Sequence, residues 1–318
     1  MYRRILVPLD GSRFGEHALP PALAFARKLG AELNLATVAL PASPEVDSPD
    51  RGMPRGEDAR DRGLARATSY LDGVTDRIRE TGFEGAVKAE VISAGNTSHS
   101  LVRHLIEVDA DLVVMTTHGR GPIQRAWLGS TADGVIRRSP VPVLLLRPEE
   151  EEGDEGSANL TLDLEAGHIP YRRVLVPLDG SRSAEEVLAI TPPLTEDDAT
   201  FTLLKVVAPF IPGGSPYLPH VVRETRDEAV VESASRDYLD DAASRFDLGG
   251  RSVEIRTRLQ GQAGMSILEV ARDEAIELIA ISTTGRGGVA RMLLGSVADK
   301  VIRGSPCPVL VYRKPEES

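Results

Sequence analysis

Two glycine-rich stretches, residues 119–130 and 285–296, have the composition of a phosphate-binding loop. Each follows a short apolar run and ends in a Gly-Ser pair that opens the next predicted helix. The first residues of a helix offer unpaired backbone N–H groups and the positive end of the helix dipole, which together attract an anion such as phosphate. Ser130 and Ser296 can add a hydroxyl. A tight turn with Ser130 as the helix cap is equally consistent with loop chemistry alone.

Residues for catalysis are scarce around these stretches. The chain contains no GxxxxGK[ST] motif, so the lysine of a P-loop is missing. His118 adjoins the first stretch, but Thr284 stands at the corresponding place beside the second. A lone histidine beside a glycine-rich turn is more often structural, and no histidine–carboxylate pairing in the repeats suggests a strong general base. The residues therefore favour ligand binding over hydrolysis or group transfer.

The elements that position these stretches alternate between strands and helices. Residues 5–9 form an apolar run closed by Asp-Gly-Ser, which predicts a buried strand and a turn. Apolar residues at helical spacing predict a helix over residues 16–29, stopped by Gly30. The pattern continues with strands at 32–40, 86–93, 111–116 and 141–146, helices at 59–80, 98–108 and 130–138, and a proline-rich loop at 41–58.

This alternation predicts an α/β fold, a doubly wound, Rossmann-like domain with a five-stranded parallel sheet and about four helices. Such a fold binds its ligands at the carboxyl ends of the strands, where the strand order reverses. Asp10 and residues 116–119 follow two of the predicted strand ends. The second half of the chain repeats the order, with a first helix shortened by Pro192 and Pro193.

The chain contains this domain twice. Residues 2–13 return as residues 171–182 with one difference, and residues 119–147 return as residues 285–313 with well over half of the positions identical. Two collinear blocks of this length do not arise by chance, so the chain is a tandem duplication.

An acidic segment separates the two copies. We place the first domain at residues 1–147, the linker at 148–169 and the second domain at 170–314. The linker is too charged to bury enough apolar surface to fold alone. Its alternating leucines suit contact of part of the linker with a domain surface, and they are Leu160, Leu162 and Leu164.

Composition excludes several classes of partner. A formal net charge of -11 argues against an electrostatic grip on nucleic acid or on an anionic membrane. No run approaches the ~18–20 apolar residues that cross a bilayer, and the N-terminus lacks the pattern of a signal peptide. The single cysteine, Cys307, leaves no intramolecular disulfide and no cysteine-based metal cluster. We therefore expect a cytoplasmic protein with no nucleic acid and no membrane as partner.

The two copies resemble the universal stress protein family, present as a tandem pair. The resemblance rests on the openings ILVPLDGS and VLVPLDGS, on the Gly-Ser pairs followed by Ala-Asp, and on the endings SPVPVL and SPCPVL. Nucleotide-binding members of the family carry a glycine, two residues, a glycine, nine residues, a glycine, and then serine or threonine. The later positions match in both copies, whereas Thr116 and Ser282 replace the first glycine, and their β-carbons narrow the approach to a ligand.

The resemblance also implies the site residues. An aspartate beside the adenosine corresponds to Asp10 and Asp179, whose carboxylates could accept hydrogen bonds from ribose or help hold magnesium on the phosphates. The same carboxylates equally suit a strand-to-helix turn. The residue that meets adenine corresponds to Val38 and Val206. The implied nucleotide contacts are Pro8, Asp10, Val38, Thr116, Gly119, Gly129, Ser130 and Thr131 in the first copy, and Pro177, Asp179, Val206, Ser282, Gly285, Gly295, Ser296 and Val297 in the second.

The function that the resemblance implies is a stress-response protein that binds ATP, with Mg²⁺ on the nucleotide, and acts as a sensor or regulator. It implies a slow ATPase at most, with no catalytic residue to name. An interaction module of the same fold without nucleotide is the alternative. The missing first glycine favours this alternative and the two Gly-Ser pairs oppose it. A true hydrolase or transferase is the weakest hypothesis, because no acid–base constellation is present.

The duplication also predicts how the copies assemble. Single-domain relatives in the family dimerise through their last strand. We therefore expect residues 141–146 and 308–312 to pair within one chain as a pseudo-dimer, which could pair again as a homodimer, because this pairing would bury two sheet edges. Both copies keep the Gly-Ser pair and the turn aspartate, so we expect two matched sites for the same ligand.

Overall fold

The computed structural model describes residues 2–39, 56–93, 96–117, 128–147, 164, 171–208, 228–283 and 294–313. The chain divides into two compact units, unit 1 within Met1–Ile169 and unit 2 within Pro170–Lys314. Each unit has its own buried core and its own set of parallel strands.

The sheet of unit 1 is parallel throughout its described strands. It runs in the order β3-β2-β1-β4-β5, with β1 paired to both β2 and β4. This order is that of a doubly wound α/β domain, as the alternation of elements predicts. The strands are β1 (Arg4–Pro8), β2 (Glu32–Ala39), β3 (Val87–Ser93), β4 (Leu112–Thr116) and β5 (Val143–Leu146).

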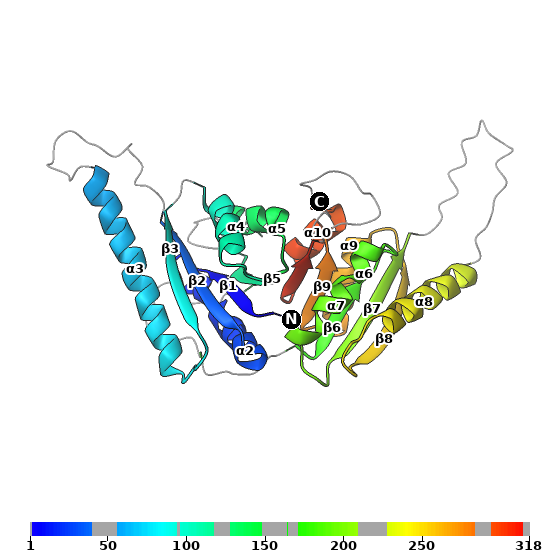
Figure 1. Ribbon diagram of the computed structural model, residues 1–318. Helices are drawn as coiled ribbons and strands as arrows, with labels where there is room; N and C mark the ends of the chain where they lie inside the picture. The colour runs from blue at the N-terminus through cyan, green and yellow to red at the C-terminus, as the bar shows by residue number, and fades with distance from the viewer. Residues whose placement is uncertain are drawn as a thin grey trace, which may run out of the picture. The chain divides into compact units, whose positions relative to one another are not determined.

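Helices cover both faces of this sheet, as Figure 1 shows. The described helices of unit 1 are α1 (Arg13–Glu16), α2 (Leu19–Leu29), α3 (Gly56–Glu80), α4 (Thr97–Glu107) and α5 (Ser130–Arg138). Right-handed crossovers place α2 and α3 on one face, and α4 and α5 together on the other. Because both faces are covered, β4 is buried at every residue, and its sequence is a continuous apolar run up to Thr116.

Unit 2 repeats this architecture. Its strands run in the order β8-β7-β6-β9-β10 and are again parallel. They are β6 (Arg173–Pro177), β7 (Thr200–Val207), β8 (Ser252–Leu259), β9 (Leu278–Ser282) and β10 (Val309–Tyr312). The helical segments are α6 (Arg182–Glu185), α7 (Val187–Ile190), the 3₁₀ turn η2 (Pro192–Leu194), α8 (Glu228–Arg245), α9 (Ala263–Asp273) and α10 (Ser296–Gly304).

The first predicted helix of unit 1 is in fact two helices. The expected span of residues 16–29 is divided between α1 and α2, because tandem prolines stand in the first turn of α2. Proline has no N–H to donate to the preceding turn and fits only the start of a helix. The predicted stop at Gly30 is confirmed, since this residue is left-handed, with a φ of 64°.

Two other expectations concern loops. Of the predicted loop at residues 41–58, the last three residues belong to α3, which begins at Gly56, and residues 41–55 lie outside the described residues. In the linker, Leu164 is buried, with 6% of its surface exposed, and its carbonyl accepts a hydrogen bond from Arg27 of α2. The expected contact of the linker with a domain surface is therefore confirmed at Leu164, whereas Leu160 and Leu162 lie outside the described residues.

Within the described ranges, no helix combines the length and the apolar character needed to span a bilayer. The longest described helix, α3, has exposed residues along most of its first half from Arg60 onward.

Candidate functional site

The predicted binding residues of each unit gather at the carboxyl ends of its strands. In unit 1, β1 lies between β2 and β4, so the strand order reverses there. Pro8 ends β1 and Asp10 follows it, while Thr116 is the last residue of β4. Loops that leave two neighbouring strands in opposite directions open a crevice, which is where doubly wound domains bind ligands. Unit 2 repeats the arrangement with Pro177, Asp179 and Ser282.

Asp10 and Asp179 organise the turn after the first strand of their units. Oδ1 of Asp10 accepts hydrogen bonds from the backbone N–H and the hydroxyl of Ser12, at 2.9 and 2.5 Å. The corresponding distances from Ser181 to Asp179 are 2.8 and 2.6 Å. The residue between them is a glycine with a φ of 76° in unit 1 and 95° in unit 2, where glycine is strongly favoured. The turn therefore uses one carboxylate oxygen and fixes the direction of the carboxylate.

The Gly-Ser pairs open α5 and α10, as predicted. Gly129 and Gly295 are the N-caps of these helices, both extended, with φ of -67° and -60°. Neither glycine has a side chain with which to cap the helix, so the interpretation of Ser130 as the cap is wrong. By contrast, α1, α4 and α6 are each capped by the side chain of their N-cap residue. The first-turn N–H groups of α5 and α10 consequently lack this partner and remain suited to an anion.

The residues around these helix starts add to the suitability for an anion. Ser130 and Ser296 are exposed, so their hydroxyls can reach a ligand. The acidic residue of the first turn is neutralised in each unit. Arg137 donates from Nε and from one Nη to the two carboxylate oxygens of Asp133, at 2.8 and 2.9 Å, whereas Arg303 donates from Nε to both oxygens of Asp299, at 3.0 Å each. An arginine paired with the aspartate offsets part of the repulsion that the carboxylate would exert on a phosphate.

We call the Gly-Ser pair at each helix start a cradle, Gly129-Ser130 in unit 1 and Gly295-Ser296 in unit 2. Each cradle is in close contact with the end of a neighbouring strand. In unit 1, the N–H of Gly129 donates to the carbonyl of Thr117 at 2.7 Å. In unit 2, a β-carbon on Gly295 would lie 3.1 Å from the carbonyl oxygen of Thr283, which is a tight contact that the backbone would have to relieve by a small shift. The Thr283 hydroxyl is buried and has no hydrogen-bond partner. An orphaned buried hydroxyl costs about 1–3 kcal/mol, and a ligand at this strand end could supply the missing partner.

The two units differ at the end of their second strand. Val38 and Val206, the predicted adenine contacts, are both half-buried near the ends of β2 and β7. The preceding Thr37 donates its hydroxyl to the Leu9 carbonyl at 3.0 Å. Lys205 takes the place of Thr37 in unit 2, and its Nζ lies 4.3 Å from the centre of the Tyr238 ring. The two units therefore have matching helix starts and differ at the end of the second strand.

Some predicted residues cannot be placed. Gly119 and Gly285, the middle glycines of the motif, and His118 lie outside the described residues. Thr116 and Ser282, which replace the first glycine, are well placed as the last residues of β4 and β9, with Thr116 buried and Ser282 half-buried. Thr131 and Val297 follow the serines in the first turn of α5 and α10.

Sequence reasoning missed a cluster of charged and aromatic side chains near each aspartate. In unit 1, Arg77 of α3 donates to Glu16 of α1 at 2.8 Å, and Tyr70 lies on the same helix as Arg77. In unit 2, Glu185, Tyr238 and Arg245 form the same arrangement. The signal was present in the sequence, since Tyr-Leu-Asp followed by four residues and arginine occurs in both α3 and α8.

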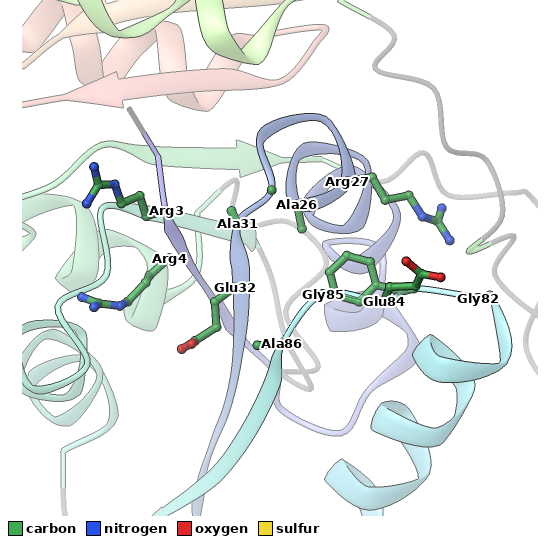
Figure 2. Close-up of a pocket in the computed structure, with 12 residues that line it drawn as sticks. Arg3, Arg4, Ala26, Arg27, Ala31, Glu32, Gly82, Glu84, Gly85 and Ala86 are labelled. Atoms are coloured by element: carbon green, nitrogen blue, oxygen red, sulfur yellow. The ribbon is translucent and has the colours of Figure 1, made fainter.

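A hollow of about 520 Å³ lies elsewhere in unit 1, at the amino ends of β1 and β2. Figure 2 shows Arg3 and Arg4 on one side of it and Arg27 on the other, pointing away from one another. Arg4 and Arg27 are engaged in hydrogen bonds with neighbouring loops. The hollow therefore has no convergent polar groups. It lies at the amino ends of the strands, whereas the predicted site lies at their carboxyl ends.

Comparison with known proteins gives a consistent result for both halves of the chain. A family model described as the universal stress protein family matches residues 1–147 and 170–313. A universal stress protein of Methanocaldococcus jannaschii is 31% identical over 164 residues, which cover 48% of this chain and 87% of the relative. A universal stress protein of Mycobacterium tuberculosis H37Rv is 24% identical over 240 residues, which cover 72% of this chain and 70% of the relative.

Solved structures show the same fold. A putative universal stress protein from Pseudomonas aeruginosa UCBPP-PA14 matches with a TM-score of 0.64 at 15% identity, covering 98% of this chain and 93% of the other. A universal stress protein from Archaeoglobus fulgidus matches with a TM-score of 0.62 at 21% identity, covering 98% of each chain.

Proposed function

Because this chain belongs to the universal stress protein family in both of its domains, we propose that it is an adenine-nucleotide-binding regulator of a stress response. The nucleotide would bind at the carboxyl ends of β1 and β4 in unit 1 and of β6 and β9 in unit 2. ATP is the proposed ligand, and partner proteins would distinguish the ATP-bound form of the chain from the ATP-free form.

The glycine-capped starts of α5 and α10 are the observation that carries this proposal. Each of these helix starts lies beside a strand end and has no side chain that caps its N–H groups. Each also has an exposed serine and an aspartate that forms an ion pair with an arginine. An anion at a helix N-terminus is stabilised by about 0.3–1 kcal/mol through the dipole alone, and direct N–H donors add charge-assisted hydrogen bonds. Phosphate is the common anion that uses several such donors at once.

Magnesium fits this proposal as a companion of the nucleotide and not as a resident ion. The described part of the chain holds no group of three or more histidine, cysteine, aspartate or glutamate side chains that could bind a metal. A single carboxylate, from Asp10 or Asp179, is a suitable partner for a Mg²⁺ ion that phosphate oxygens and water already coordinate. The ion would supply neutralisation of phosphate charge, while the aspartates orient the ribose or the ion.

Regulation by binding is a better fit than rapid catalysis. The P-loop lysine is missing from the sequence, and neither copy pairs a histidine with a carboxylate in its glycine-rich stretch. We propose slow ATP turnover at most. A cytoplasmic location, supported by the single cysteine, belongs to the same proposal.

The second candidate function is an interaction module that no longer binds nucleotide. The side chains of Thr116 and Ser282 favour it, because each adds a β-carbon where the family signature has glycine. A buried Thr283 hydroxyl without a partner opposes it in unit 2, because a fold that has lost its ligand has no reason to retain an unsatisfied polar atom at the strand end.

Assembly forms part of the proposal. Two tandem domains of this family fit a pseudo-dimer, and we propose pairing between β5 and β10, with a homodimer of the whole chain as a further step. We also propose the domain boundaries 1–147 and 170–314, joined by the linker 148–169. Limited proteolysis should cut first in the linker, and fragments that separate without denaturant would contradict the proposed pairing.

The decisive experiment identifies the ligand. Mass spectrometry of small molecules released by heating purified protein should find an adenine nucleotide, and calorimetric titration with ATP and magnesium should give two sites per chain. Gly129→Val and Gly295→Val should each remove one site. Gly63→Val, at an exposed helix position with open space around it, is the matched control. Unchanged stoichiometry in both cradle variants would show that the phosphate is placed wrongly, and no binding by the wild type would favour the interaction module.

A further inference from the structure

A cluster of three side chains recurs beside the aspartate of each unit. Arg77 and Glu16 are joined at 2.8 Å, and so are Arg245 and Glu185. Both glutamate side chains are nearly buried, with 10% and 6% of their surface exposed. Tyrosine and arginine are seven residues apart in each helix, so both side chains lie on the same face, two turns apart.

The tyrosines connect this pair to the aspartates. The hydroxyls of Tyr70 and Tyr238 are buried. Burial raises the pKa of Tyr70, and the negative charges of Glu16 and Asp10 raise it further. Tyr238 shows the same raised pKa, from burial and from the neighbouring Glu185 and Asp179 carboxylates. The hydroxyl in each unit therefore stands within electrostatic reach of both carboxylates.

Backbone contacts carry the position of the glutamate to the aspartate. Glu16 ends α1, a single turn whose start is capped by Ser12, and the Glu16 N–H donates to the Ser12 carbonyl at 3.3 Å. Ser12 in turn holds Oδ1 of Asp10. Arg77, by fixing Glu16 from α3, fixes a turn too short to hold its own direction. The chain from α3 to the aspartate is thus Arg77, Glu16, Ser12 and Asp10.

Stability alone does not account for this arrangement. The arginine of each pair is exposed to solvent, by 38% for Arg77 and 44% for Arg245, and an ion pair with a solvent-exposed partner contributes little to stability. The pair nevertheless occurs with the same geometry in both copies, although most other residues of α3 and α8 differ between the copies. A requirement shared by the two sites explains this better than two separate requirements for stability.

We propose that Glu16 with Arg77, and Glu185 with Arg245, are positioning residues that aim Asp10 and Asp179 at the ribose hydroxyls of the bound nucleotide. This inference rests on the proposed nucleotide binding and adds the residues that position the aspartate. The pair acts through the aspartate and does not touch the ligand.

The test compares ATP with 2′,3′-dideoxy-ATP, both with magnesium, on the full chain. Gly295→Val silences unit 2, so that titration reports unit 1 alone. In this background the unmodified unit 1 should bind ATP roughly tenfold more tightly than the dideoxy analogue, because a hydrogen bond to a charged group is lost. Arg77→Met should bring the ratio close to one by weakening ATP and leaving the dideoxy analogue unchanged.

Matched variants separate positioning from folding. Arg79→Met is the control, since Arg79 is an exposed arginine on the same helix, paired with Asp76. Arg77→Lys keeps the charge and should restore much of the ratio. If Arg77→Met does not fold, Glu16→Gln makes the same test with an isosteric side chain. In unit 2, Arg245→Met in a Gly129→Val background should behave like Arg77→Met, with Arg236→Met as its control.

Each outcome has one meaning. A ratio that falls in Arg77→Met and not in Arg79→Met supports the positioning role. An equal loss of affinity for both nucleotides, or a ratio unchanged from the control, overturns it while nucleotide binding stands. A wild type that binds ATP and the dideoxy analogue equally also overturns it, since no ribose recognition exists to be positioned. Absence of binding of either nucleotide to the wild type overturns the proposed function itself.

Discussion

Adding a carboxylate at the start of α5 should move stability and ligand binding in opposite directions. Ser130 is the first residue of α5 after its glycine N-cap, and it is exposed. In Ser130→Asp the new negative charge faces the positive end of the helix dipole, which stabilises the fold by about 0.3–1 kcal/mol. For a domain of this size the melting temperature should rise by roughly 1–4 °C. Stability alone would therefore make the variant look like an improvement.

The same carboxylate should repel a phosphate at the cradle. Two unit charges about 5 Å apart interact by about 3 kcal/mol at an effective dielectric constant of about 20, and salt reduces this value. A loss of about 1.4–3 kcal/mol corresponds to a tenfold to roughly hundredfold weaker affinity. The effect should be largest for ATP, smaller for AMP and smallest for adenosine, because only the phosphates feel the charge. Ser296→Asp should do the same in unit 2.

Calorimetric titration and thermal melts of the same samples check both signs. Ser130→Asn is the matched control, because it has the shape of aspartate without its charge. It should bind ATP within a few-fold of the wild type and should gain little stability. If Ser130→Asp binds ATP as well as Ser130→Asn does, the phosphate does not lie at the start of α5. If the melting temperature of Ser130→Asp falls, the side chain of residue 130 does not lie at the positive end of the α5 dipole as the structure describes.

Three further predictions concern single positions. Restoring the family glycine in Thr116→Gly and Ser282→Gly should raise ATP affinity while destabilising the strand end by about 1 kcal/mol or less. A titration that shows unchanged ATP affinity would contradict the proposed steric restriction. Burial acts to raise the pKa of Glu32, but hydrogen bonds from Lys88 and Asn34 outweigh it and lower the pKa. The stability that the ionised Glu32 carboxylate contributes is therefore present at neutral pH and is lost as the pH falls through the folded-state pKa. Urea unfolding should find Glu32→Gln less stable than the wild type by under about 1 kcal/mol at pH ~7, and equally stable at about pH 3. Burial raises the pKa of the Cys307 thiol to about 11, so iodoacetamide at about pH 8 should modify native protein far more slowly than urea-unfolded protein, and equal rates would show the thiol to be accessible.

Local signals in the sequence were enough to predict most of the elements. The helix expected at residues 130–138 is observed as Ser130–Arg138, because a Gly-Ser start and a Ser-Pro end both act within one turn. The prediction for residues 16–29 missed a break, since apolar residues keep their helical spacing across α1 and α2 while Pro20 and Pro21 interrupt the hydrogen bonds. Spacing reports which face is apolar and does not report whether the backbone is continuous.

The parts of the candidate site that are formed by contiguous backbone motifs were predictable from the sequence. The parts that are formed by side chains distant in the sequence were not. The Gly-Ser cradles and the turn aspartates are contiguous motifs, so a sequence shows them directly. The pairing of Glu16 with Arg77 joins two helices across a strand and a long connection, and nothing local marks the glutamate as a partner. The repeated Tyr-Leu-Asp was visible but is too short to indicate a role without the fold.

The difference at the second strand shows how a duplicated site can diverge. Under the proposed function, recognition of phosphate by N–H groups of α5 and α10 would depend on backbone geometry, which tolerates substitution as long as Gly129 and Gly295 remain. Recognition at the end of β2 and β7 depends on side chains, and there Thr37 and Lys205 differ in charge, length and partner. A change in side chain at this end leaves the phosphate cradle intact. If the proposed nucleotide binding holds, the two units would bind the phosphates in the same way, while the ends of their second strands would favour different groups in the rest of the ligand.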